Sequence, residues 1–208
     1  MARLKLGILI SGRGSNLQAL ARAFAASDAR AEIALVVSST HSAGGLIWAR
    51  QQGLPCQVVD HRDHADRAAF DAALDERLRA AGVELICLAG FMRLLGDSFV
   101  EAWRDRMVNI HPSLLPAFKG RHPQRQAIEA GVRISGCTVH FVRPAMDAGP
   151  IIGQAAVPVQ ADDDETSLAS RILEAEHRLY PAVVQLIAEG AIEVRGERVV
   201  LAPTARER

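Results

Sequence analysis

Cysteine is scarce in this sequence, with Cys56, Cys87 and Cys137 as its three copies and no CxxC pair among them. An odd number of widely separated cysteines fits neither a disulfide framework nor a zinc site. Two of the three lie in apolar, strand-like runs, so we expect buried and unreactive thiols.

Aromatic residues and net charge are also low. Aromatics make up 4% of the 208 residues, which disfavours a stacking platform for single-stranded nucleic acid. The 24 Lys and Arg residues balance 24 Asp and Glu residues, so no general attraction to nucleic acid or to an anionic membrane follows. Any anion site in this chain must therefore be local.

Long apolar runs are missing as well. The longest, LICLAGFM, runs from Leu85 to Met92 and is far shorter than the ~18 residues that a membrane span requires. The N-terminal MARLKLGILI leads directly into polar SGRGSN without a small-residue cleavage site. With 49% hydrophobic and 23% charged residues, the chain has the composition of an ordinary globular protein, and we expect a cytoplasmic one.

Short apolar runs alternate with segments of helical period in the first half of the chain. This alternation predicts an α/β fold with a Rossmann-like, mostly parallel sheet and helices on both faces. Two helical stripes have the spacing of crossover helices that lie on a sheet. The first stripe consists of Leu17, Leu20 and Phe24, and the second of Phe70, Leu74, Leu78 and Ala81. The expected strands are 4–10, 32–38, 56–60, 84–90 and 106–110.

The pattern changes after Pro116. Two strand-like runs, 135–142 and 149–159, are separated only by RPAMDA, which predicts a hairpin and a mixed, antiparallel C-terminal part. A long helix is expected over 166–189, preceded by acidic DDDE and kinked at Pro181. A small hairpin turning at Arg195 and Gly196, followed by a loose tail, ends the chain, which has the length of a single domain over 1–208.

The loop SGRGSN, Ser11 to Asn16, joins the first expected strand to the first helix. In a parallel α/β sheet this place presents free backbone N–H groups to an anion, and glycines let the backbone approach a phosphate. The alternative is a tight turn with a helix cap and no ligand. GxGxxG would need a glycine at Leu17, and GxxxxGK[ST] has no counterpart, so neither NAD binding nor ATP hydrolysis is favoured.

The run VNIHPSLLPAFKGRH places Asn109 and His111 two residues apart, on the same side of an extended chain. An amide donor beside an imidazole suits the oxyanion of a tetrahedral acyl-transfer intermediate. Asp147, in MDAGP, could orient the His111 ring and favour its charged form. Taken singly, His111 is more often a structural histidine and Asp147 more often an Asx-turn residue.

Six segments together resemble the folate-dependent formyltransferases: ISGRGSNLQAL, LAGFMRLL, NIHPSLLPAFKGRH, TVHFV, DAGPII and EAEHRLYP. The resemblance runs from Ile10 to about Pro181, and its GSN element points to the glycinamide ribonucleotide formyltransferases of purine biosynthesis. It implies formyl transfer from 10-formyltetrahydrofolate to the amine of 5-phosphoribosyl-glycinamide, without a metal. It also implies a nucleotide-binding half over about 1–105 and a folate-binding, catalytic half over about 106–208.

The resemblance assigns residues to three sites. It implies that Asn109, His111 and Asp147 are catalytic and that Gly14, Ser15 and Asn16 hold the phosphate of the substrate. It implies a folate cleft formed by Arg67, Met92, Arg93, Leu94, Leu95, Asn109, Arg143, Pro144, Ala145 and Met146. Without the resemblance, Met92, Leu94 and Leu95 would be interpreted as ordinary core.

Glu176 falls inside the apolar stripe of the last long helix, where an unpaired carboxylate would be costly. Its partner is either an arginine of the same protein or, as the resemblance implies, the ribose hydroxyls of the substrate. Leu173 stands where the family has a polar residue that assists the phosphate, so the glycine loop is expected to carry more of that binding. His122 and His140 also lie in motif segments, and neither is interpreted as catalytic.

Three rival interpretations use the same residues. A formyltetrahydrofolate hydrolase would keep Asn109, His111 and Asp147 and use water in place of the amine. A methionyl-tRNA formyltransferase would need an added RNA-binding domain and a basic surface, which we do not expect here. A non-catalytic nucleotide-binding relative would keep the fold alone. The expected partners are small molecules, not nucleic acid or membrane, and the expected state is a monomer or homodimer.

Overall fold

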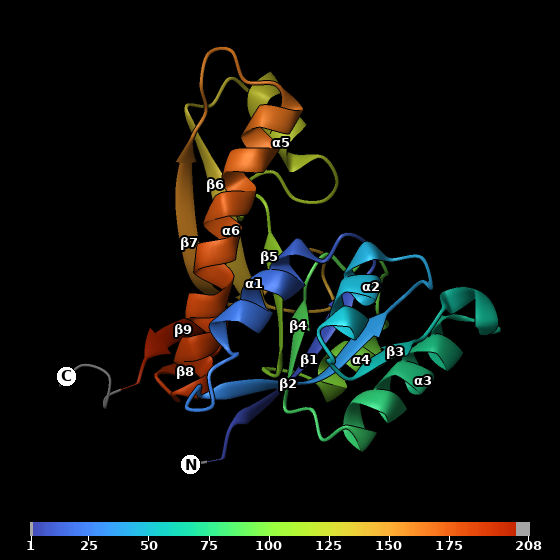
Figure 1. Ribbon diagram of the computed structural model, residues 1–208. Helices are drawn as coiled ribbons and strands as arrows, with labels where there is room; N and C mark the ends of the chain where they lie inside the picture. Colours follow the sequence, from blue (N-terminus) through green and yellow to red (C-terminus); the bar gives the residue numbers. More distant parts are fainter. Residues whose placement is uncertain (1, 203–208) are drawn as a thin grey trace. The chain divides into compact units, whose positions relative to one another are not determined.

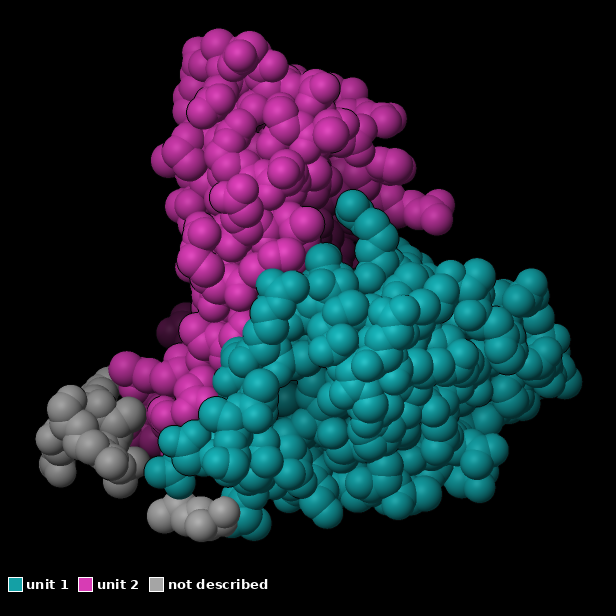
Figure 2. All heavy atoms as spheres, in the orientation of Figure 1, with its two compact units in different colours: residues 1–108 teal, residues 109–208 magenta. Residues whose placement is uncertain are grey.

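Seven strands form the main sheet of the computed structural model in the hydrogen-bonded order β3-β2-β1-β4-β5-β6-β7, and a separate pair is formed by β8 and β9 (Figure 1). The structure describes residues 2–202, so the expected C-terminal tail lies largely outside the described residues. The chain divides into two compact units, residues 1–108 and 109–208, which Figure 2 colours separately. Each unit is built around a different kind of strand pairing.

The first unit is a parallel sheet with crossover helices. Every neighbouring pair in the order β3-β2-β1-β4 is parallel. Its strands are β1 (Leu4–Ile10), β2 (Ala31–Ser38), β3 (Cys56–Val58) and β4 (Leu85–Leu88). Its helices are α1 (Ser15–Ala23), α2 (Gly44–Gln51), α3 (Arg67–Ala80) and α4 (Asp97–Ala102), with a 3-10 turn at His61–Asp63.

Strand β1 shows why helices cover both faces of this sheet. A Cβ at Gly7 would lie 2.7 Å from the Leu78 side chain, so α3 packs directly on that face of β1. The Ile10 side chain would lie 3.0 Å from a Cβ at Gly45 in α2. Residues 7 and 10 of a strand point to opposite faces, so α3 and α2 lie on opposite sides of β1.

The second unit is built on an antiparallel hairpin. Strand β5 (Met107–His111) crosses from the first unit into the second, and β6 (Ile134–Phe141) then pairs antiparallel with β7 (Ile151–Pro158). Helix α6 (Glu165–Ala188) packs closely on this hairpin, since a Cβ at Gly153 would lie 3.0 Å from the Val183 side chain. The remaining elements are α5 (Pro123–Glu129) and the hairpin of β8 (Ile192–Arg195) and β9 (Arg198–Leu201).

The predicted fold class is confirmed, and so are all seven main strands. Three strands are shorter than expected: β3 ends at Val58, β4 ends at Leu88, and β7 spans only Ile151–Pro158. At these ends the backbone leaves the ladder for loops. The predicted long helix begins at Glu165, because Asp164 and Ser167 form a reciprocal capping box, and it continues past Pro181 to Ala188. Among the described residues, no helix combines the length and apolar character that crossing a membrane requires.

Candidate active site

The C-terminal end of strand β5 carries Asn109 and His111, the two residues predicted to lie on the same side of an extended chain. Asn109 is half-buried and His111 is 5% exposed. Both lie in the second unit, together with Asp147 and His140. The structure therefore brings the expected trio into a single polar cluster, and it adds a second histidine.

The His111 ring is held at both nitrogens. Its Nδ1 lies 3.4 Å from Oδ1 of Asp147, and its Nε2 lies 3.0 Å from the carbonyl oxygen of Phe118. A carbonyl oxygen can only accept, so Nε2 carries a hydrogen. The Nδ1 atom faces a carboxylate oxygen, which can accept a hydrogen bond from the ring. The side chains of His111 and Asp147 are 7% and 12% exposed, so solvent screens this pair little.

Asp147 uses its two carboxylate oxygens for two different segments. Oδ1 faces His111, and Oδ2 accepts a hydrogen bond of 2.7 Å from the backbone N–H of Gly120. The residue has a φ of 46°, in the left-handed region that aspartate tolerates better than most residues. The carboxylate thus joins the loop after β6 to the segment after β5, instead of serving only a local turn.

His140 lies on β6 and is 2% exposed. Its Nδ1 is 3.0 Å from the Phe141 carbonyl oxygen and 3.2 Å from that of Ala148, and its Nε2 is 3.4 Å from Nδ2 of Asn109. Burial lowers the pKa of His140, and the neighbouring His111 adds to that effect, whereas Asp147 opposes it. The sequence analysis placed His140 near the site without linking it to Asn109.

A buried threonine fixes the chain that follows His111. Thr138 Oγ1 donates to the Ser113 carbonyl oxygen at 2.7 Å and accepts the Leu115 N–H at 3.0 Å. Thr138 and His140 are two residues apart on β6, so one face of that strand carries both polar contacts to the β5 end. The alternation of Thr138 and His140 with apolar neighbours is the sequence signal that could have revealed this polar face.

In the first unit, the glycine loop has the geometry that close backbone approach requires. Gly14 has a φ of 73°, and a Cβ there would lie 2.6 Å from the Gly45 Cα. Helix α1 begins at Ser15 without a side-chain cap on its first turn, and Asn16 is buried. The N–H groups of a first helical turn have no acceptor inside the helix, so this end of α1 can hold an anion.

The segment after β4 is anchored at both ends within the first unit. The Met92 N–H donates to Ser11 Oγ at 2.8 Å, and Ser11 Oγ lies 2.7 Å from Ser39 Oγ. At the other end, the Gly96 N–H donates to Oδ2 of Asp71 at 2.7 Å. Burial raises the pKa of Asp71. Asp71 and Ser11 are supporting residues that the sequence analysis did not identify.

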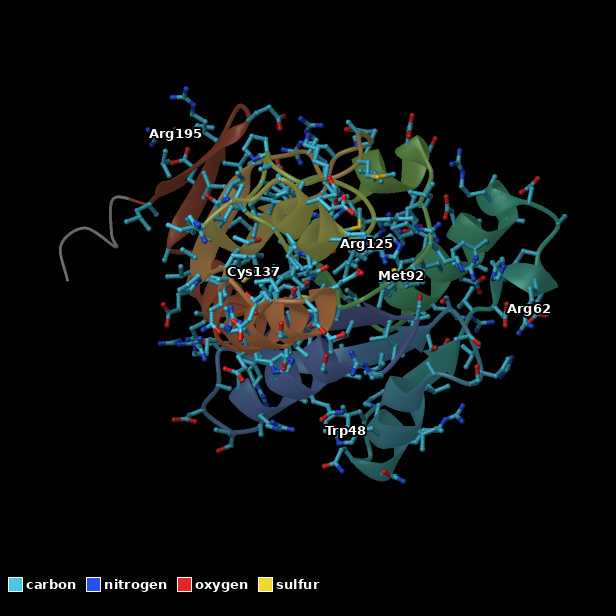
Figure 3. The ribbon with its side chains drawn as sticks, turned by 90° about the horizontal axis from the view of Figure 1, so that it is seen from above. Trp48, Arg62, Met92, Arg125, Cys137 and Arg195 are labelled. Atoms are coloured by element: carbon cyan, nitrogen blue, oxygen red, sulfur yellow. The ribbon has the colours of Figure 1, made fainter. Side chains whose placement is uncertain are left out.

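Between these anchors the apolar side chains face outward. Met92 is 75% exposed and Leu94 is 68% exposed, so the interpretation of these two residues as ordinary core is wrong. Met92 is labelled among the side chains drawn in Figure 3. Leu95 is half-buried. Large apolar side chains on an ordered segment are suited to contact with a flat organic ring.

The arginines expected at the folate cleft have three different surroundings. Arg67 is the first residue of α3 and is exposed, next to Gly96. Arg93 lines a cavity of about 360 Å³ beyond the carboxyl ends of β2 and β3. Arg143 is buried, and its Nε donates to the Glu197 carboxylate at 3.1 Å. The Arg143 side chain is therefore engaged by the terminal hairpin, while Pro144, Ala145 and Met146 are exposed.

Glu176 is 6% exposed on α6, as its place in the apolar stripe predicted. It lies near Cys137 of β6. Burial raises the pKa of the Cys137 thiol to about 12, and the Glu176 charge adds to the rise. Cys137 and Cys87 are buried, as expected, and Cys56 is only half-buried.

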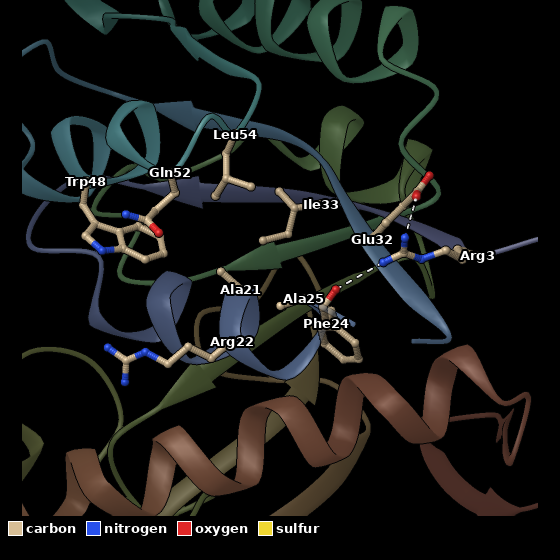
Figure 4. Close-up of a pocket in the computed structure, with 10 residues that line it drawn as sticks. All are labelled: Arg3, Ala21, Arg22, Phe24, Ala25, Glu32, Ile33, Trp48, Gln52 and Leu54. Carbon is tan, nitrogen blue, oxygen red and sulfur yellow. Dashed lines mark hydrogen bonds and ion pairs between the residues drawn. The ribbon is translucent and has the colours of Figure 1, made fainter. Parts of the chain in front are cut away.

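A further cavity of about 380 Å³ lies over β2 between α1 and α2, lined by Trp48 and Phe24 among others (Figure 4). Its lining includes none of the residues that the sequence analysis assigned to a catalytic, phosphate or folate site. Across residues 2–202, no three His, Cys, Asp or Glu side chains are grouped in a way that could hold a metal ion.

Comparison with known proteins places this geometry in context. The family model described as "Formyl transferase" matches residues 4–184. The chain is 39% identical over 191 residues to phosphoribosylglycinamide formyltransferase of Escherichia coli, covering 92% of this chain and 90% of the relative. A solved structure, glycinamide ribonucleotide transformylase 1 from Symbiobacterium toebii, matches with a TM-score of 0.93 and 48% identity, covering 96% of this chain and 94% of that one.

Longer relatives carry the same region as one part of a larger protein. The chain is 50% identical over 192 residues to the trifunctional purine biosynthetic protein adenosine-3 of Gallus gallus, which covers 92% of this chain. The chain spans only 19% of the length of that relative.

Proposed function

The chain belongs to the formyl transferase family, and on this premise we propose that it transfers a formyl group from 10-formyltetrahydrofolate to the amine of 5-phosphoribosyl-glycinamide. The products are N-formylglycinamide ribonucleotide and tetrahydrofolate, a step of purine biosynthesis that we expect in the cytoplasm. The carrying observation is the His111 ring, held between a carboxylate and a carbonyl two residues after Asn109.

In the proposed mechanism the substrate amine attacks the formyl carbon, and the carbonyl electrons move to the formyl oxygen. Asn109 and protonated His111 donate hydrogen bonds to the resulting oxyanion. Since Nδ1 of His111 faces Asp147, the ring has only Nε2–H to offer, and the formyl oxygen takes the place of the Phe118 carbonyl. No covalent intermediate with the enzyme forms.

Collapse of the tetrahedral intermediate breaks the bond between the formyl carbon and N10 of the folate. N10 leaves with a proton from His111, and the proton lost by the attacking amine passes through water to His111, which regains the proton it gave. The sum of these transfers moves one proton from the amine to N10, so the enzyme returns to its starting state. Asp147 orients the ring through its contact with Nδ1 throughout these steps.

Substrate binding follows the residues that match the family. We propose that Gly14, Ser15 and Asn16 hold the phosphate and that Glu176 binds the ribose hydroxyls. Exposed Met92 and Leu94, with Leu95, contact the pterin ring, which the large outward-facing side chains support. The folate site is completed by Arg67, Arg93 and the loop 143–146. In that loop Arg143 contributes its backbone to the site, and its side-chain contact with Glu197 holds the loop in shape.

The deciding experiment follows the absorbance of 10-formyl-folate in the presence and absence of glycinamide ribonucleotide. Consumption that depends on the added amine is the expected result. Consumption without the amine would instead identify a hydrolase, and ligand binding without consumption would identify a non-catalytic relative.

Asn109→Ala and His111→Ala test the assigned roles. Each variant should lower kcat about 100-fold or more, because each removes a donor to the transition-state oxyanion, while nucleotide affinity stays nearly unchanged. His122→Ala is the control, since His122 is exposed and pairs with Glu165 outside the trio. Near-normal turnover of either trio variant would contradict its role.

A further inference from the structure

The His140 ring is in one defined protonation state. Its Nδ1 lies 3.0 Å from the Phe141 carbonyl oxygen and 3.2 Å from the Ala148 carbonyl oxygen. Both partners can only accept, so Nδ1 must carry the hydrogen. In a neutral ring with its hydrogen on Nδ1, the Nε2 atom has a free lone pair and can only accept.

The surroundings of His140 keep that ring neutral. The residue is 2% exposed, and burial penalises its charged form. Two charged groups face it from neighbouring segments: His111 of β5, which disfavours a second positive charge, and Asp147 of the loop after β6, which favours one. Burial is the largest of these effects, so it lowers the pKa of His140.

A lone pair at Nε2 decides which way the Asn109 amide points. A side-chain amide can lie in two orientations that exchange its NH₂ group and its oxygen. The Nδ2 atom of Asn109 lies 3.4 Å from Nε2 of His140, so the NH₂ end can donate one hydrogen there. In the reverse orientation the amide oxygen would face the lone pair, which is repulsive.

The orientation determines what Asn109 offers to a substrate. An NH₂ group that gives one hydrogen to His140 keeps its second hydrogen for another acceptor. A reversed amide would present its oxygen at that position and would repel an oxyanion. We propose that His140 is a positioning residue that fixes the Asn109 amide with its NH₂ group toward the reacting formyl oxygen. This inference rests on the proposed function.

A double-mutant cycle separates positioning from a general structural effect. His140→Leu removes the lone pair at similar size and should lower kcat about fivefold to tenfold, which matches the loss of one neutral hydrogen bond. The KM for the nucleotide should stay within about twofold. His140→Gln places a carbonyl oxygen within reach of Asn109 and should recover most of the lost kcat.

The cycle repeats the leucine substitution in the Asn109→Ala background. If His140 acts through Asn109, His140→Leu should cause no further fall in kcat there. An equal fall in both backgrounds would overturn the proposal. Thr138→Val is the matched control, because Thr138 is a buried polar residue of the same strand that contacts Ser113 and Leu115 instead of Asn109. Its effect on kcat should be the same in both backgrounds.

Nitrogen NMR of the imidazole rings tests the inference without turnover and without relying on a variant that folds. In the unliganded enzyme at neutral pH, His140 should show a protonated Nδ1 and an unprotonated Nε2. A hydrogen on Nε2 would overturn the proposal. If Asn109→Ala kept normal kcat, the proposed function of Asn109 would fail, whereas the NMR result would still report on His140 alone.

Discussion

Asp147 contacts two separate segments of the candidate site through one side chain. It adopts a left-handed backbone conformation, faces His111 with one oxygen and accepts the Gly120 N–H with the other. The sequence predicted the first contact from chemistry alone. The second contact ties the segment after β5 to the same carboxylate, so the charge and the loop position depend on one side chain.

Asp147→Asn separates the charge from the loop contact. The amide oxygen can still accept the Gly120 N–H, but the negative charge beside His111 is lost. We expect kcat to fall about 100-fold, because Nδ1 of His111 loses its carboxylate partner, while the KM for the nucleotide changes little. Steady-state kinetics across pH measures both quantities.

Asp105→Asn is the matched control for that substitution. Asp105 is an exposed aspartate of the first unit, and like Asp147 it lies in a turn with a positive φ, here 57°. Its kcat should match that of the wild type. If Asp147→Asn and Asp105→Asn were equally active, Asp147 would have no part in the mechanism.

At the scale of secondary structure, polar residues follow the carboxyl ends of two strands. The glycine loop follows β1, and Asn109 and His111 stand at the end of β5. The conformation of the glycine loop also depends on a residue outside the loop, because α1 and α2 approach each other closely at Gly14 and Gly45. The Gly45 N–H donates to the Gly12 carbonyl oxygen at 3.0 Å, which fixes the loop against α2.

Gly14→Ala tests this contact. The added Cβ would lie 2.6 Å from the Gly45 Cα, and the backbone φ of 73° disfavours alanine. We expect the free energy of unfolding to fall by about 2 kcal/mol or more and the KM for the nucleotide to rise. Chemical denaturation and steady-state kinetics measure the two effects.

Gly12→Ala is the control within the same loop. A Cβ at Gly12 meets no atom within 4 Å, and its φ is not in the left-handed region. Its free energy of unfolding should stay within about 0.5 kcal/mol of the wild type. If Gly14→Ala and Gly12→Ala destabilised the protein equally, the close approach of Gly14 to Gly45 would not be the reason why alanine is disfavoured at position 14.

For the whole molecule, acid sensitivity follows from carboxylates whose pKa values are lowered by their partners. Arg171 holds the pKa of Asp163 at about 2, below the value of about 3.9 for an unfolded chain. The folded state therefore binds fewer protons than the unfolded state in this range. The stability that Asp163 contributes is complete above about pH 4 and is lost as the pH falls toward about 2.

Asp163→Asn should therefore lower the Tm at about pH 6, and the difference from the wild type should narrow at about pH 3. Thermal unfolding followed by circular dichroism measures this difference. Asp162→Asn changes the exposed neighbouring residue and is the control. Its Tm should differ little from that of the wild type at about pH 6 and at about pH 3. A gap between Asp163→Asn and the wild type that stayed constant across this range would contradict the assigned ion pair.

Local pattern and physical chemistry predicted a large part of this molecule. The positions of the strands and helices follow from the period at which hydrophobic residues recur along the chain. That period depends only on local backbone geometry, so a few neighbouring residues are enough to reveal it. The nearness of Asn109 and His111 follows from the two-residue period of a strand. The burial of Glu176 follows from helical period in the same way.

The sequence by itself determined the fold class, the strands and the residue types that can stabilise an oxyanion, because each of these depends on neighbours along the chain. The tertiary structure alone decided that His140 faces Asn109, that Glu197 engages Arg143 and that Met92 is exposed. These contacts join residues on different elements. Their geometry depends on how the β6–β7 hairpin, the loops and the terminal hairpin pack, which no local period encodes.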